Sequence, residues 1–402
     1  MKNKTQKTKQ LTVGINASFL RKPGTGLGQV TLNFLRKLSE FKIQNSKSKE
    51  KEIKFILYLE EPLSKNVKLS KNFETRVFLP MWRRDDLIRK TWWEKYQLPK
   101  KAKEDGCDVF FSLYQCPTIL PKGIKHIMLV HDIIPKLFRE YLDTARKETY
   151  QMLTERAIKK ADKIVVVSKR TEKDLIQHLK IEGKKITVNY IDTDEIYKKK
   201  ATKENTQKML RKYKLKPGYI LAGGGLELRK NIEGVISAYN YLYEKNKNEH
   251  FVAELPKLVI YGKLMPHLAP LVTDAEKSIK KLNLTKCVKL LDAVPQDNLP
   301  ALFANASMFV YPSRYEGFGL PVLEAMNQGT PVITSKTSSL PEVGRDAALY
   351  CHPEDPKDIA MVMKNVLVNK NLRETLSRRG KERAKAFSWK NFVDKFLKLL
   401  NA

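Results

Sequence analysis

Short apolar runs alternate with longer stretches in which apolar residues recur every three or four positions, and this alternation continues along most of the chain. Such runs, bounded by turn residues, predict buried strands, and the periodic stretches predict amphipathic helices. Their regular succession is typical of a parallel sheet covered by helices. The predicted strands lie at 11–18, 54–60, 75–80, 109–112, 125–131, 163–168 and 186–190, and then at 219–223, 257–262, 288–291, 308–312, 331–335 and 348–351.

The strands fall into two groups, which predicts an α/β protein with two Rossmann-like, doubly wound parallel-sheet domains that face each other across a cleft. The first domain is expected over 1–195 and the second over 217–380. A charged stretch without strong apolar periodicity, 196–216, is expected as the linker. The last segment, 381–402, is predicted to be helical and to pack back toward the first domain. Its apolar face consists of Phe387, Trp389, Phe392, Phe396 and Leu399.

Several loops that follow predicted strands contain glycine, charged or hydroxyl residues. In open parallel sheets, ligands bind outside the carboxyl ends of the strands. Loops of this kind from both domains should therefore converge on one cleft. The residues concerned are Gly24–Gly28, His131, Asp132, Ser168, Gly223–Gly225, Gly262 and Glu316.

The most informative loop precedes a helix predicted to begin near residue 321. Pro321 suits the first helical position, where an N–H group has no intrahelical partner. Gly317 and Gly319 let the backbone approach a ligand, and free N–H groups at a helix start favour an anion. Glu316 precedes the helix and Glu324 is placed in its first turn, so two carboxylates flank a predicted diphosphate site and can accept hydrogen bonds from sugar hydroxyls. The alternative is that a first-turn Glu only complements the helix dipole.

The glycine turn Gly223–Gly225 is followed by Arg229 and Lys230, which are expected to open a helix. The turn, which includes Gly224 and Gly225, can clamp a diphosphate together with these two cations. Either cation could also stabilise the negative charge that builds on a leaving phosphate. Because the chain is rich in Lys, a solvated Arg–Lys pair is the competing interpretation.

Two features of the first domain have both a structural and a functional interpretation. Gly24–Gly28 has the spacing G-x-G-x-G, and the position about 20 residues further on lies in a Lys-rich stretch, which argues against an NAD site. The turn at Gly26 and Gly28 either contacts a phosphate or sugar acceptor or is purely structural. His131 either supports its strand end or forms a hydrogen bond to a sugar hydroxyl or to developing charge.

The formal net charge is +32, from 76 Lys and Arg against 44 Asp and Glu, and the excess is larger in the first half of the sequence. Most of the basic residues are Lys. The charge therefore reflects either a compositional bias or a surface for an anionic membrane or an anionic acceptor. Zinc-finger, RNP-type and helix-turn-helix signatures are absent, so a nucleic-acid partner is not expected.

The sequence shows no sign of a membrane-spanning segment, a signal peptide or a metal site. No apolar run approaches the roughly 18 residues that span a bilayer, and the basic start lacks the features of a signal peptide. The four Cys are scattered, which suits free thiols in a reducing compartment. The His residues show no metal-ligand pattern, so neither a metal nor a cofactor is predicted. The chain is expected in the cytoplasm, either free or on the cytoplasmic face of a membrane.

The sequence resembles the family-four retaining glycosyltransferases, which have the two-domain GT-B architecture. The most specific element is Glu316-x7-Glu324 within EGFGLPVLEAMNQGTPV, followed by Ser338-Ser-Leu-Pro-Glu342-Val. The resemblance is dense over 219–354 and extends through most of the chain. In the first half it includes the glycine turn at 24–28, Trp93-Glu94, His131-Asp132 and Ser168-Lys169.

The resemblance implies a nucleotide-sugar donor, a GDP-, UDP- or ADP-sugar, bound mainly by the second domain without a catalytic metal. It places Glu316 on hydroxyls of the donor sugar and Glu324 on the ribose. Arg229 and Lys230 correspond to the pair that binds the diphosphate. Other positions carried over are Phe318, Gly319 and Leu320 as backbone contacts to the donor, His131 near the donor sugar, and Gly26–Gly28 beside the acceptor.

This sequence departs from the family pattern at Gly225, where many members carry Arg or Thr, and at Asp292-Ala293, where a glycine is usual beside the base. The expected function is transfer of a mannose or glucose type hexose to a glycan or lipid-linked hydroxyl acceptor by front-face attack, with retention of configuration. Two alternatives stay open. One is a phosphorylase or epimerase of the same architecture, and the other is a basic nucleic-acid-binding protein with an inactive cleft.

Overall fold

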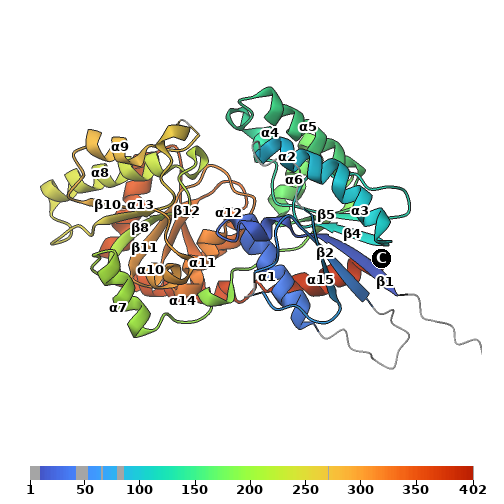
Figure 1. Ribbon diagram of the computed structural model, residues 1–402. Coiled ribbons are helices and arrows are strands. Elements are labelled where there is room, and N and C mark those ends of the chain that lie inside the picture. The colour runs from blue at the N-terminus through green and yellow to red at the C-terminus, as the bar shows by residue number, and fades with distance from the viewer. Residues whose placement is uncertain (1–9, 42–52, 65–66, 79–85, 270, 402) are drawn as a thin grey trace, which may run out of the picture. The chain divides into compact units, whose positions relative to one another are not determined.

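The structure is a computed structural model that describes residues 10–41, 53–64, 67–78, 86–269 and 271–401 (Figure 1). It consists of two compact units. Unit 1 contains Met1–Ile191 and Ser388–Ala402, and unit 2 contains Asp192–Phe387. All the predicted strands are present to within about three residues, apart from positions 79–80, which lie outside the described residues. The prediction of two doubly wound parallel sheets is confirmed.

Unit 1 is built on a seven-stranded sheet whose order is β3-β2-β1-β4-β5-β6-β7. Its strand pairs are parallel; in the central pair of β1 and β4, Val13 lies opposite Val109. The order reverses direction between β1 and β4, which makes their carboxyl ends the switch point of the sheet. The strands are β1 (Leu11–Asn16), β2 (Ile53–Leu59), β3 (Phe73–Val77), β4 (Val109–Ser112), β5 (Lys125–Val130), β6 (Lys163–Val166) and β7 (Ile186–Val188).

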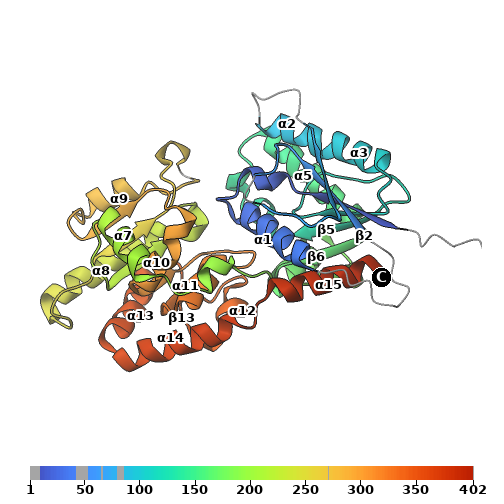
Figure 2. The ribbon, with the colours of Figure 1, turned by 60° about the horizontal axis from the view of Figure 1, so that its bottom comes forward.

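Helices α1 and α15 pack together in unit 1, although they lie at opposite ends of the sequence (Figure 2). The ring of Phe396 stacks on Phe111 of β4 at 4.5 Å and meets Phe34 of α1 edge-on at 5.2 Å. The helices of unit 1 are α1 (Gly26–Glu40), α2 (Asp86–Trp92), a π-helical turn (Trp93–Gln97), α3 (Leu98–Glu104), α4 (Ile134–Leu137), α5 (Ala145–Lys160), α6 (Lys169–Leu179) and α15 (Trp389–Asn401).

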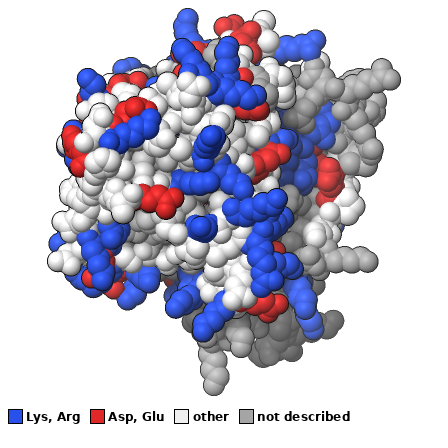
Figure 3. Space-filling model, turned by 90° about the vertical axis from the view of Figure 1, so that its left-hand side faces the viewer, with Lys and Arg blue, Asp and Glu red and all other residues white. Residues whose placement is uncertain are grey.

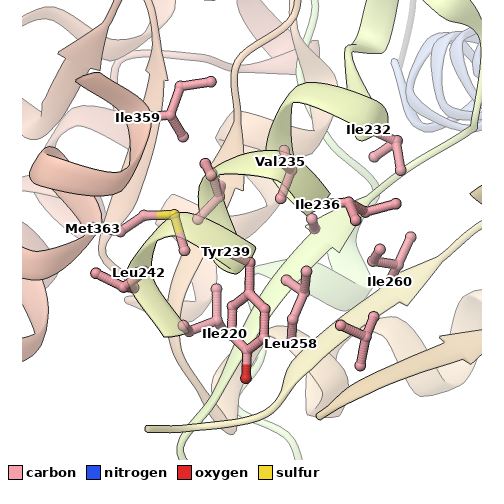
Figure 4. Packing of buried hydrophobic residues seen from close by; sticks show 14 of the residues in the cluster. Ile220, Ile232, Val235, Ile236, Tyr239, Leu242, Leu258, Ile260, Ile359 and Met363 are labelled. Atoms are coloured by element: carbon pink, nitrogen blue, oxygen red, sulfur yellow. The ribbon is translucent and has the colours of Figure 1, made fainter. Parts of the chain in front are cut away.

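Unit 2 contains a six-stranded parallel sheet of order β10-β9-β8-β11-β12-β13, with the reversal between β8 and β11. Its core forms where α8 (Ile232–Glu249) and α13 (Pro356–Val368) pack on the sheet, as Figure 4 shows for Ile236 and Tyr239 of α8 and Met363 of α13. The strands are β8 (Tyr219–Gly223), β9 (Leu258–Tyr261), β10 (Val288–Leu291), β11 (Ala306–Tyr311), β12 (Val332–Ser335) and β13 (Ala348–Cys351).

The stretch 196–216, expected as a linker, contains a helix of unit 2. Met209 on this helix is buried, and the helix packs against α10. The helical end of the chain divides at Phe387, because α14 belongs to unit 2 and α15 to unit 1. The helices of unit 2 are α7 (Lys203–Lys212), α8 (Ile232–Glu249), α9 (Ala275–Lys281), α10 (Leu299–Ala304), α11 (Leu320–Gln328), α12 (Leu340–Gly344), α13 (Pro356–Val368) and α14 (Lys370–Ala384).

The positive charge of the chain is visible on its surface. Figure 3 shows a face on which Lys and Arg side chains are widespread, with Asp and Glu between them. Within the described residues, no helix combines the length and the apolar character that crossing a membrane requires. The four Cys are free thiols, as predicted, and only Cys287 is not fully buried.

Candidate active site

The candidate site lies at the carboxyl ends of β8 and β11, the switch point of the unit 2 sheet. The turn Gly223–Gly225 begins at the last residue of β8, and the loop 312–319 follows β11. A Cβ atom on Gly223 would lie 2.0 Å from the carbonyl oxygen of Tyr261, so a larger residue does not fit there. A Cβ atom on Gly224 would lie 3.1 Å from Pro321 of α11. The predicted glycine turn and the predicted helix start are therefore neighbours.

Helix α11 begins one residue earlier than predicted. Gly319, with φ 112°, precedes Leu320, the first helical residue, and Pro321 is the second. Proline is accepted there because the first N–H groups of a helix have no intrahelical partners. Glu324 is the fifth helical residue, so its predicted place in the first turn is wrong. The interpretation of Glu324 as a first-turn complement of the helix dipole is therefore excluded.

Glu316 is a buried carboxylate with three partners on one oxygen. Its Oε1 lies 2.6 Å from Nη1 of Arg229 and accepts hydrogen bonds from the hydroxyls of Tyr311 at 2.6 Å and Ser313 at 2.9 Å. Burial alone would raise its pKa, but Arg229 and then Lys230 outweigh burial and hold the pKa at about 2. Glu316 is therefore ionised at neutral pH, and Oε2 is the oxygen that can accept hydrogen bonds from a ligand.

Arg229 and Lys230 lie in a 3₁₀ turn (Leu228–Lys230) that precedes α8, instead of opening the helix as predicted. The helix starts later because Asn231, with φ 59°, separates the two elements. Neither cation is the solvated side chain of the competing interpretation, since Arg229 is 13% and Lys230 only 9% exposed. Nζ of Lys230 donates to the carbonyl oxygen of Gly224 at 2.6 Å. Lys230 is thus fixed at the glycine turn, and Arg229 is held at the loop 312–319 by Glu316 and by the carbonyl oxygen of Tyr315.

Glu324 has the opposite pKa shift from Glu316. Burial raises its pKa to about 7, and this effect exceeds the lowering by Lys230 and by a hydrogen bond from Tyr197. Asp194, which is also near, raises the pKa further. The Tyr197 hydroxyl also accepts a hydrogen bond from the side-chain amide of Gln296 at 3.0 Å. Glu324 is therefore a carboxyl group that changes protonation near neutral pH.

The loop 312–319 is held by residues to which the sequence assigned no role. Oγ of Ser339 donates to the carbonyl oxygens of Glu316 at 2.9 Å and Phe318 at 2.8 Å, and Oγ of Ser338 accepts the N–H of Glu316 at 2.9 Å. These bonds hold the backbone at Glu316 and Phe318, on either side of Gly317. The Ser338-Ser motif was visible in the sequence, but which backbone groups it holds depends on the fold.

In unit 1, Gly26 and Gly28, the two glycines predicted to lie beside the acceptor, differ in how closely they are surrounded. The N–H of Gly28 donates to Oγ1 of Thr25, the residue that caps α1, at 3.2 Å. A Cβ atom on Gly28 would lie 2.0 Å from the carbonyl oxygen of Lys22, whereas a Cβ atom on Gly26 would meet nothing within 4 Å. Gly28 therefore has a structural reason to be glycine, and Gly26 has no such reason.

His131 follows β5 and is buried, with Nε2 3.0 Å from the carbonyl oxygen of Leu113. Burial lowers its pKa to about 4, so the ring is neutral at pH 7. Because a carbonyl can only accept, Nε2 carries the proton and Nδ1 is left as an acceptor. Its neighbour Asp132 accepts the N–H of Ile134, and Ser168 caps α6 through the N–H of Thr171.

Among the described residues, His, Cys, Asp and Glu form no group of three that could hold a metal ion. The side chains at the unit 2 site include the cations of Arg229 and Lys230 and the carboxyl groups of Glu316 and Glu324, with hydroxyl groups around them. This set suits a ligand that contains both phosphate and hydroxyl groups.

Two family models and a curated relative match the chain. The model of Glycosyltransferase Family 4 matches residues 59–195, and that of Glycosyl transferases group 1 matches residues 203–383. The chain is 30% identical over 383 residues to the O-antigen chain mannosyltransferase B of Escherichia coli, which covers 92% of this chain and 94% of that protein.

Solved structures show the same fold. Sucrose-phosphate synthase from Thermosynechococcus elongatus superposes with a TM-score of 0.74 at 16% identity, over 98% of both chains. Anabaena Alr3699/HepE in complex with UDP-glucose gives a TM-score of 0.71 at 14% identity, over 98% of this chain and 100% of that one.

Proposed function

This chain belongs to the family-four glycosyltransferases of GT-B architecture, and we propose that it transfers a hexose of mannose or glucose type from a nucleotide-sugar to a hydroxyl group of a glycan or lipid-linked acceptor. A mannose donor is supported by the mannosyltransferase relative, whose name refers to O-antigen chains. A nucleotide-sugar donor is supported by the UDP-glucose in the Anabaena neighbour. GDP-, UDP- and ADP-sugars are the candidate donors.

The observation that carries the proposal is the ionised Glu316 held against Arg229 at 2.6 Å, beside Lys230 and the start of α11. A donor has a sugar with hydroxyl groups and a diphosphate next to it. A carboxylate accepts hydrogen bonds from the hydroxyls, and cations stabilise the phosphates. The close placement of a carboxylate and two cations here supports binding of such a donor.

Each residue then has a defined role. Glu316 accepts hydrogen bonds from hydroxyls of the donor sugar through Oε2, and Glu324 accepts them from the ribose. Arg229 and Lys230 stabilise the negative charge on the leaving diphosphate. The backbone of Gly317, together with that of Phe318, Gly319 and Leu320, and the turn of Gly224 and Gly225 complete the donor site. The acceptor binds unit 1 beside Gly26 and Gly28.

The reaction proceeds with retention of configuration by front-face attack. The acceptor oxygen bonds to the anomeric carbon on the side from which the diphosphate leaves, and the acceptor proton passes to the departing phosphate oxygen. Because its ring is neutral, His131 accepts a hydrogen bond from a sugar hydroxyl at Nδ1. The chemistry uses Arg229 and Lys230, and no metal ion, to offset the phosphate charge.

The test is an assay of sugar transfer with GDP-mannose and UDP-glucose and an extract of lipid-linked glycans, in EDTA. The wild type should transfer one sugar, and NMR of the product should show the anomeric configuration of the donor. Glu316→Gln should lower the rate by about 100-fold or more, since it removes charge from a preorganised site. Equal rates for both proteins would contradict the role of Glu316, and an inverted product would contradict the mechanism.

We also propose that the basic surface holds the protein on an anionic membrane where a lipid-linked acceptor is found. The support is the charge of +32 and its larger excess in the first half of the sequence. Binding to vesicles that contain an anionic phospholipid should be clear at low salt and should fall steeply as the salt concentration rises. Absence of binding at low salt would show that the charge is only compositional.

A further inference from the structure

A third carboxylate, Glu227, lies beside the phosphate-binding cations, and neither the sequence nor the proposed reaction gives it a role. Its Oε2 is 3.7 Å from Nζ of Lys230, and its Oε1 is 4.0 Å from Nη2 of Arg229. Both distances are within the range of strong Coulomb attraction but too long for hydrogen bonds. The carboxylate therefore occupies the neighbourhood of the cations without being locked onto them.

The surroundings of Glu227 are shaped around this position. Gly225 makes room for it, because a Cβ atom on Gly225 would lie 2.5 Å from Oε2 of Glu227 and 3.2 Å from Nζ of Lys230. Oε2 is buried and finds no hydrogen-bond donor among the described residues. A buried carboxylate oxygen without a donor is unfavourable. Glu227 thus lies near the cations in an arrangement that its carboxylate can leave at little cost in free energy.

The backbone of Glu227 is fixed while its side chain can leave. The backbone pairs with Val272 in an antiparallel bridge, and its carbonyl oxygen accepts the N–H of Lys230 at 2.8 Å. The side chain is 38% exposed, so rotation of its carboxylate into solvent is open. Arg229 remains paired with Glu316 in either position. The cation that Glu227 and a phosphate would share is therefore Lys230.

We propose that the Glu227 carboxylate is a built-in counter-ion of Lys230 that competes with the terminal phosphate of the nucleoside diphosphate. This inference rests on the proposed function. When the donor binds, its phosphate takes the place beside Lys230 and the carboxylate rotates outward. When the product diphosphate must leave, the same carboxylate replaces it. Glu227 thereby weakens the binding of donor and product and speeds the release of the product.

The test is calorimetric titration of the wild type, Glu227→Gln and Glu227→Asp with GDP, UDP, ADP and dTDP, and with the matching nucleoside monophosphates. Glu227→Gln should bind its diphosphate roughly tenfold more tightly, because one negative charge next to the phosphate is removed. The monophosphate, which lacks the terminal phosphate, should bind within twofold of the wild type. Glu227→Asp keeps the charge and should stay close to the wild type.

Glu233→Gln is the matched control, because Glu233 is an exposed carboxylate in the first turn of α8 outside the site. This variant should bind the nucleoside diphosphate and the nucleoside monophosphate with the affinities of the wild type. Unchanged or weaker diphosphate binding by Glu227→Gln, with normal binding by the wild type, would overturn the inference alone and would mark Glu227 as a support for Lys230. Failure of all the proteins to bind any nucleotide would overturn the proposed function as well.

Discussion

Glu316 and Glu324 are separated by seven residues and have the same side chain, yet their pKa values move in opposite directions. Glu316 has Arg229 at 2.6 Å, and its pKa is about 2. Glu324 is dominated by burial, with Lys230 and Tyr197 as weaker opposing influences, and its pKa is about 7. Environments that move the pKa values of two identical groups apart are typical of active sites. Glu316 is ionised throughout the neutral pH range, whereas Glu324 changes its protonation within that range.

This difference predicts a pH effect on stability. The pKa of Glu324 is raised by folding from 4.5 to about 7, so the folded state holds its proton more tightly. The stabilisation is complete below pH 4.5 and is lost as the pH rises through about 7. Across this range, the free energy of unfolding of the wild type should fall by about 3 kcal/mol relative to Glu324→Gln. Urea denaturation of both proteins from pH 4.5 to 8 measures this difference in the free energy of unfolding. If the free energies of the two proteins changed equally with pH, the raised pKa of Glu324 would be contradicted.

Single residues of the site were predictable where their type is unusual for their place. Glu316, Arg229 and the glycine turn could be identified because charge and glycine follow a buried strand. Tyr311 and Tyr197 could not, because Tyr311 looks like an ordinary strand residue and Tyr197 lies in a stretch that resembles a linker. Their partners come from other elements, and only the folded chain brings them together.

At the scale of elements, the start of α1 contains two glycines, and only one of them, Gly28, is required to be glycine by the packing around it. Gly28→Ala should destabilise unit 1 by more than about 2 kcal/mol, because its Cβ atom would lie 2.0 Å from the carbonyl oxygen of Lys22. Gly26→Ala should be neutral or stabilising by about 0.5–1 kcal/mol, since it meets nothing within 4 Å and removes backbone freedom. Thermal unfolding of the two variants measures the difference, and equal melting temperatures would contradict the packing at Gly28.

Strands were predicted better than helix ends, and the reason is physical. A buried parallel strand is apolar at nearly every position, so its sequence marks it clearly. The start of α11 depends on the left-handed conformation of Gly319, and the end of the 3₁₀ turn depends on that of Asn231. Helix α7 was missed because it is highly charged and buries only Met209 fully.

At the scale of the molecule, the chain returns to unit 1 at its end. Phe396 of α15 is 1% exposed and packs between Phe34 and Phe111. Phe396→Ala should cost unit 1 about 3–5 kcal/mol, because a large buried ring is removed. Unit 2 should keep its stability. Calorimetry should therefore show a lower melting temperature for one transition only, and equal lowering of both transitions would contradict the assignment of α15 to unit 1.

The two-sheet organisation followed from the sequence because each sheet is made of consecutive segments, in which local pattern and overall topology agree. The return of the chain to unit 1 was predicted for 381–402 and is found for 388–402, since 381–387 belongs to unit 2. The partners of this segment were not predicted. Phe34 and Phe111 lie hundreds of residues away, and a hydrophobic pattern does not name the surface that it covers.

The most direct test of the central claim is a thermal-shift panel with GDP, UDP, ADP and dTDP in EDTA, on the wild type and on Glu324→Ala. At about 100 times its dissociation constant, a bound nucleotide should add roughly 2.7 kcal/mol to the unit that binds it. The predicted result is a shift of the unit 2 transition by one of the four nucleotides, lost in Glu324→Ala. A folded protein that none of the four stabilises, or a shift that persists in Glu324→Ala, would contradict a nucleotide-sugar site at the ends of β8 and β11.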